Sequence, residues 1–185
     1  MSLRTLSQVD TCVDVSAPLK TLYHSHEGIV KQLRELGELP RLAQQMAQAR
    51  RVSAASVALF RDDVLLHHQD EERDLFPAVI GSASPGAERE SAQALTARLV
   101  AEHRELEQMW KTLEPSVRAV ARGRAEGLDA VLLERLVQAY VAHARFEEEH
   151  FLPLAQAILG RNPNHLGAVG VALHMRRKPG LPGYI

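Results

Sequence analysis

The chain of 185 residues is poor in cysteine and in aromatic residues. Because Cys12 is its one cysteine, an intrachain disulfide is excluded. Aromatic residues make up 4% of the composition, so aliphatic side chains and alanine must fill the interior. Hydrophobic residues reach 45%, and the chain is long enough to bury a real core. The composition therefore indicates one globular domain.

The chain also lacks a dominant charge and a long apolar run. Lys and Arg number 22 against 23 Asp and Glu, for a net charge of −1, which gives no reason to expect a nucleic acid or a membrane surface as partner. No apolar run approaches the roughly 18 residues of a transmembrane helix, and the N-terminus lacks a signal-peptide pattern. We therefore expect a cytoplasmic protein, with a homodimer as an open option.

Strand patterns of period two are absent, whereas apolar residues recur with the helical period of 3.6. Four helices are expected: from after Ser16 to Gly37, from Leu42 to Ile80, from about Ala87 to Pro115, and from Asp129 to Gly160. The second has a possible interruption near residues 53–56, and Pro115 should kink or end the third. Short connections then predict an all-α fold, an up-down-up-down four-helix bundle. The expected organisation is an N-terminal arm (1–17), the bundle (18–160), and a short C-terminal helix and tail (161–185).

Two segments repeat one pattern, in which a His is followed by a Glu four residues on and by a Pro six residues after that Glu. The two sets are His67, Glu71, Pro77 and His143, Glu147, Pro153. Residues four apart lie on one face of a helix, so the His nitrogen and the Glu oxygen can grip one metal ion. The chain holds four His-x-x-x-Glu pairs, where about one is expected by chance. A lone pair of this kind would be as consistent with a solvated surface pair as with a ligand pair.

Each expected helix carries a titratable residue in its apolar stripe, and in a bundle these residues converge on one depth of the core. The inward set is His26, His67, Glu71, His103, His143 and Glu147. No Lys or Arg shares the stripes, and buried carboxylates are costly unless they are paired or coordinated. Imidazole suits Fe, Zn, Cu and Ni, and a carboxylate can bridge two ions. The pattern therefore predicts a metal site.

Several neighbours lie beside these stripes. His68 is about 100° from His67 on the helix and is expected on the flank, where it, Glu72 and Glu102 are open to a role in orienting ligands. Glu107, at the stripe edge, could be a ligand, an orienting group or a solvated carboxylate. His150 is interpreted as a hydrogen-bonded histidine at the bundle end.

At these residues the sequence resembles the hemerythrin-like (HHE cation-binding) family. The resemblance rests on the two Pro-terminated segments, on His26 with Ile29 three residues on, and on Glu102-His103; it spans roughly residues 19–177. It implies a four-helix bundle around a non-haem di-iron centre. The implied ligands are His26, His67, Glu71, His103, His143 and Glu147, with Glu71 and Glu147 bridging the irons. Zinc is a possible substitute for iron.

One departure shapes the expected function. Oxygen-carrying hemerythrins have His-x-x-x-His on the third helix, whereas here the later position is Glu107. The set is more similar to the regulatory and iron–sulfur repair branches. The expectation is a protein that binds or senses dioxygen or nitric oxide, or that handles iron. The alternatives are a di-iron enzyme of peroxidase or nitric oxide reductase type, an iron donor for cluster repair, and a structural or metal-free bundle.

Overall fold

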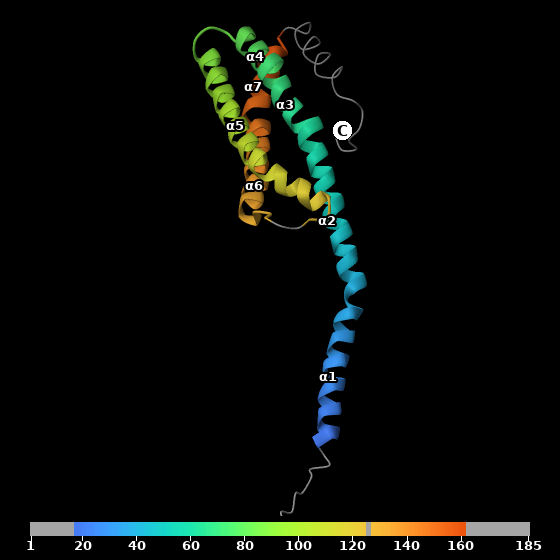
Figure 1. Cartoon of the computed structure of the whole chain (residues 1–185). Helices are drawn as coiled ribbons and strands as arrows, with labels where there is room; N and C mark the ends of the chain where they lie inside the picture. Colours follow the sequence, from blue (N-terminus) through green and yellow to red (C-terminus); the bar gives the residue numbers. More distant parts are fainter. Residues whose placement is uncertain (1–16, 125–126, 162–185) are drawn as a thin grey trace, which may run out of the picture. The chain divides into compact units, whose positions relative to one another are not determined.

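A computed structural model describes residues 17–124 and 127–161, and of residues 17–25 it describes the backbone alone (Figure 1). Every element in these ranges is helical, and no strand occurs among them, which confirms the all-α prediction. No helix in this part is long and apolar enough to cross a membrane. The N-terminal arm and the expected helix after Gly160 lie outside the described ranges.

The chain divides into two compact units between Ala47 and Gln48. The first unit contains α1 (Ala17–Gly37) and the start of α2 (Leu39–Leu59). α1 ends at Gly37 as predicted, but Pro40 does not stop the helical path, since it lies in the first turn of α2, where its missing N–H costs nothing.

The apolar stripe predicted for the first helix is exposed. His26 and its stripe neighbours Ile29, Leu33 and Leu36 are all accessible in this unit. Nothing among the described residues of this unit covers the stripe, so its burial in a core stays a prediction.

The second unit begins with one unbroken helical path. It consists of the end of α2, η1 (Phe60–Val64), α3 (Leu65–Asp70), η2 (Glu71–Leu75) and α4 (Phe76–Ser82). The interruption expected near residues 53–56 is absent. Instead the path contains two π-helical segments, which carry one extra residue per turn and which recur at functional sites.

Two further helical rods complete this unit. The first is α5 (Ala87–Ala121), and the second joins α6 (Ala130–Phe146), η3 (Glu147–Phe151) and α7 (Leu152–Leu159). Asp129 caps α6 as predicted, accepting a hydrogen bond of 2.9 Å from the Leu132 N–H. α5 continues through Pro115, and its last part turns away from its first part (Figure 1), so of the two outcomes predicted for this proline the helix shows the kink and not the end. Three joined rods are thus described in this unit, and the four-helix count stays a prediction.

Two apolar clusters pack these rods together. One contains Phe76, Leu99 and Phe151, and the other contains Leu106 and Leu136. Along each rod, the segment that bears the predicted metal ligands lies between the residues of one cluster and those of the other. The three rods run alternately up and down, so the segments 67–71, 103 and 143–147 come to one level. The level that contains the predicted ligands is therefore covered by one apolar cluster on each side.

An ion pair ties the start of α5 to the end of α7. Hydrogen bonds from Arg161 and from the Ser84 N–H lower the pKa of Glu88 from 4.5 to about 2. Because the folded pKa lies below the unfolded one, this stabilisation is present above pH 4.5 and is lost as the pH falls towards 2. Glu88→Gln should therefore flatten the fall in stability between pH 4.5 and 2, measured by urea unfolding. Glu90→Gln, which changes an exposed carboxylate two residues further along α5, should leave that fall unchanged.

Candidate metal centre

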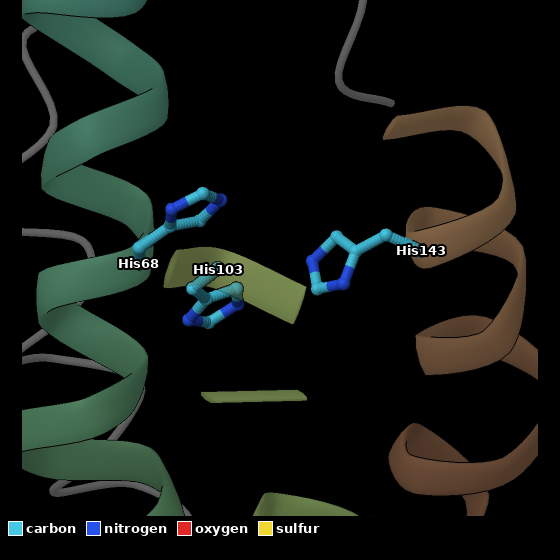
Figure 2. Close-up of side chains that lie close together, drawn as sticks. All are labelled: His68, His103 and His143. Carbon is cyan, nitrogen blue, oxygen red and sulfur yellow. The ribbon is translucent and has the colours of Figure 1, made fainter. Parts of the chain in front are cut away.

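Three histidines from the three rods meet at the polar level. His68 comes from α3, His103 from α5 and His143 from α6 (Figure 2). One nitrogen from each lies within 4.8 Å of the others, and the exposed fractions of the residues are 1%, 0% and 3%. The His68 and His103 rings stack with centroids 3.9 Å apart, and the His143 ring meets the His103 ring edge-on at 4.9 Å.

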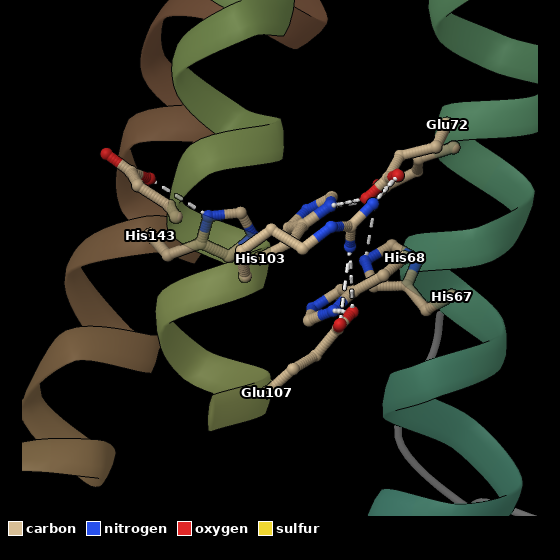
Figure 3. Close-up of polar contacts among 9 residues, drawn as sticks. His67, His68, Glu72, His103, Glu107 and His143 are labelled. Atoms are coloured by element: carbon tan, nitrogen blue, oxygen red, sulfur yellow. Dashed lines mark hydrogen bonds and ion pairs between the residues drawn. The ribbon is translucent and has the colours of Figure 1, made fainter. Parts of the chain in front are cut away.

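Each of these imidazoles is oriented by a carboxylate at Nδ1 (Figure 3). The three Nδ1–carboxylate contacts are His68 to Glu107 at 3.2 Å, His103 to Glu72 at 2.8 Å, and His143 to Glu102 at 3.0 Å. An ionised carboxylate can only accept, so Nδ1 carries the proton and donates. The lone pair of each ring is therefore on Nε2. This carboxylate–histidine arrangement is the one that orients metal-binding imidazoles in proteins.

The three Nε2 atoms are buried and have no hydrogen-bond partner within the described part of the chain. A buried polar atom that lacks a partner costs about 1–3 kcal/mol. Three such acceptors directed into one small space would raise that cost together. A cation bound between them would satisfy all three.

A second group of ligand atoms adjoins the first. It consists of His67, Glu71 and Glu147, and its atoms also lie within 4.8 Å of one another. Glu71 connects the two groups, since one of its oxygens is 3.3 Å from His67 Nε2 and the other is 3.4 Å from His103 Nε2. Glu71 and Glu147 are both buried. Carboxylates and imidazoles grouped in this way are donors for a cation, and the two adjacent groups could hold two ions.

Arginines hold the orienting carboxylates in place. Arg104 makes hydrogen bonds to Glu72 and, at 3.3 Å, to both oxygens of Glu107. Arg98 donates to Glu102 at 2.7 Å and lies over the Phe146 ring. Each inward histidine is therefore linked through a half-buried carboxylate to an exposed arginine. We call such an arginine–carboxylate–histidine chain of contacts a relay.

The pKa shifts agree with this arrangement. Burial, followed by the charges of the neighbouring histidines and Arg104, lowers the pKa of His68 to about 2. Burial also lowers the pKa of His103, against the opposing hydrogen bond to Glu72. The pKa values of Glu72 and Glu102 are lowered, because hydrogen bonds from histidine and arginine outweigh the effect of burial. At neutral pH His68 and His103 are therefore uncharged, and Glu72 and Glu102 are ionised.

Removing the arginine that serves two relays should weaken metal binding without removing a ligand. We expect Arg104→Gln to lower metal affinity by about tenfold, at the low end of the 10–100-fold cost typical of groups behind the ligands. Competition against a chromophoric chelator measures this. Arg135→Gln is the matched control, because Arg135 forms a similarly exposed ion pair with Glu105. Equal losses in the two variants would contradict the relay.

The structure brings together five of the six residues predicted as ligands, in the two groups just described. They are His67, Glu71, His103, His143 and Glu147. The sixth, His26, lies in the other unit and is exposed, so its binding of metal stays a prediction. His150 is exposed and belongs to neither group. Glu107 orients His68 rather than being solvated.

His68 was the residue that sequence reasoning missed. The expected flank position is wrong: His68 is 1% exposed, whereas the side chain of His67 is 28% exposed. The extra residue in η1 moves the inward position one residue along the helix, from His67 to His68. A His-His pair with Glu four residues after each member was the available signal.

A buried level of imidazoles and carboxylates within a helical unit defines this chain as a helical metal-binding protein. It belongs to the Hemerythrin HHE cation binding domain family, whose model matches residues 17–155. An uncharacterized protein of Haemophilus influenzae is 26% identical over 137 residues, which are 72% of this chain and 76% of that relative. No solved structure matches the chain.

Proposed function

We propose that the chain holds a binuclear non-haem iron centre and uses it to bind or sense dioxygen or nitric oxide. The observation that carries this is the pair of adjacent ligand groups joined by Glu71. One oxygen of that carboxylate faces His67 and the other faces His103, as a bridge between two ions requires. His103, His143 and Glu147 complete the protein ligands at this level, with His26 as a further ligand from the first helix.

The mixture of donors favours iron. Carboxylate oxygens and imidazoles together suit ferrous and ferric ions, and the single cysteine at position 12 leaves no thiolate cluster that would favour zinc or copper. Zinc remains able to occupy the same donors as a substitute. When bound, iron would supply the redox chemistry and the affinity for diatomic gases. The protein's part is to orient the ligands and to exclude water.

An apolar pocket beside the site supports a gas as the ligand. The pocket has a volume of about 310 Å³ and lies between the end of α2, η1, α5 and α6. It is lined mostly by aliphatic residues and reaches Tyr140, whose ring centroid is 6.0 Å from that of His143. Such a lining suits a small uncharged molecule better than a polar substrate.

Metal analysis and gas binding test the proposal. Protein purified without added metal should contain about two iron atoms per chain by elemental analysis, as a binuclear site requires. The diferrous form should show new absorption bands on anaerobic addition of nitric oxide. Protein that binds zinc but neither iron nor nitric oxide would contradict the proposal and would point to a structural metal. Iron that moves readily to an apo-cluster protein would favour iron handling instead.

A further inference from the structure

The resemblance to the family assigns His67, not His68, as the ligand from the second helix, yet the structure places His68 among the buried imidazoles. We propose that His68 is itself a metal ligand, so that His68, His103 and His143 hold one divalent transition-metal ion through their Nε2 atoms. This inference rests on the proposed binuclear centre and adds a residue to it.

The first argument is the state of the His68 ring. Its Nδ1 contacts Glu107 at 3.2 Å, and its buried Nε2 has no hydrogen-bond partner among the described residues. A histidine kept only for packing would satisfy both nitrogens or be replaced by an apolar side chain without cost. A ring with one oriented nitrogen and one open inward lone pair is prepared to bind a cation.

The second argument is that a carboxylate orients the His68 ring in the same way as a carboxylate orients His103, a predicted ligand. Glu107 orients His68 as Glu72 orients His103, and Arg104 binds both carboxylates. The two relays therefore share one guanidinium and have equivalent ends. His68 is therefore oriented in the same way as His103, whose Nε2 also faces Glu71.

The third argument is geometric. One ring nitrogen of each histidine lies within 4.8 Å of the other two, whereas a tetrahedral ion with bonds of about 2.1 Å holds its nitrogens about 3.4 Å apart. Movements of about an ångström would close this difference. Because the His68 and His103 rings are stacked 4° from parallel, one of the two rings must also turn so that both lone pairs face the ion. The consecutive residues His67 and His68 then serve separate groups, one beside Glu147 and the other beside His143.

The three imidazoles would share this ion with one oxygen of Glu71, which is 3.4 Å from His103 Nε2. The third helix has Glu107 where a second histidine of that helix would lie in an oxygen carrier, and His68 supplies an imidazole in contact with Glu107 instead. In the proposed site the second helix thus supplies the imidazole that the third helix lacks.

Cobalt(II) is the probe that tests the proposal, because a bound histidine ring gives a hyperfine-shifted, exchangeable Nδ1–H signal in proton NMR. Apo protein is loaded with Co²⁺ alone, and the signals are counted in the wild type and in His68→Gln. We expect the variant to lose one signal and to lose more affinity for one ion than the roughly 10–100-fold that removal of an orienting group costs, with its circular dichroism unchanged. His103→Gln should behave alike, and His150→Gln, at an exposed position, should match the wild type.

A second variant guards against misfolding of the first. Glu107→Gln keeps the side-chain volume and should shift or broaden the His68 signal while leaving the number of bound ions unchanged. A wild-type spectrum and affinity in both variants would overturn the role of His68 and leave the binuclear centre standing. Failure of the wild-type protein to bind Co²⁺, Fe²⁺ or Zn²⁺ would overturn the centre and the inference together.

Discussion

Removal of the bound metal should lower the thermal midpoint of unfolding by about 8–16 °C. A ligand present at a thousand times its dissociation constant stabilises a folded protein by about 4 kcal/mol. For a chain of this size, each kcal/mol shifts the midpoint by about 2–4 °C. The structural reason is local: removal of the cation takes away the ligand of the buried Glu71 and Glu147 carboxyl groups and of three buried imidazole Nε2 atoms. Differential scanning calorimetry with and without a chelator measures the shift.

The same scans on variants show whether the shift comes from the buried level. His143→Ala should remove most of the chelator effect, because the wild-type ligand set is broken before the chelator is added. His150→Ala should retain the full effect, since His150 is exposed one helical segment away. A chelator effect that survives in His143→Ala would place the stabilising ion elsewhere in the chain.

The helical period predicted the third and fourth helices well. Leu99, His103, Leu106 and Leu113 are buried on α5 as their spacing indicated. The same holds on the last rod, where the predicted stripe continues through His143 and Glu147. In both rods the apolar residues are spaced by three and four, and the polar ligands occupy the same phase. Burial of the stripe therefore fixed the direction of the ligands as well.

The π-helical segments could not be predicted from spacing. They change the number of residues per turn locally, at η1, η2 and η3. η2 and η3 begin at the predicted ligands Glu71 and Glu147, and η1 ends three residues before His67. An ordinary helical wheel assumes 100° per residue, so its phase is displaced after η1 and His68 is assigned to the flank. What stabilises a π turn is the tertiary contact that it permits, here the approach of His68 to His103 and Glu107. That contact lies 35 or more residues away along the sequence and is not visible in any local window.

Exposure of the first helix's stripe has a different physical origin. His26, Ile29 and Leu33 have the spacing of a buried face, and spacing says that a helix is amphipathic without saying what covers it. The prediction that His26 is a metal ligand therefore rested on the family resemblance as well as on this spacing. The residues of the second unit form two ligand groups by themselves, so the contribution of His26 is separable from theirs by experiment.

The largest single effect on metal content is expected from Glu71→Gln. Glu71 is the one carboxylate with an oxygen directed at each ligand group, towards His67 on one side and His103 on the other. Gln keeps the volume but removes the charge and one of the two acceptor oxygens, so it cannot bridge two cations. We expect the variant to retain at most one ion per chain, and elemental analysis after dialysis measures this directly. Metal-free Glu71→Gln should also unfold at a higher temperature than metal-free wild type, because a buried carboxyl group has been replaced by a neutral amide.

Neighbouring carboxylates supply graded controls for this variant. Glu147→Gln should weaken the group that contains His67, whereas Glu148→Gln, at an exposed position, should bind metal as the wild type does. Glu72→Gln should keep both ions but bind them about 10–100-fold more weakly, because Glu72 orients His103 instead of touching the ions. Two ions at wild-type affinity in Glu71→Gln would show that the carboxylate does not join the two groups. The opposite changes in metal content and in metal-free stability make the result hard to confuse with simple misfolding, which would lower both.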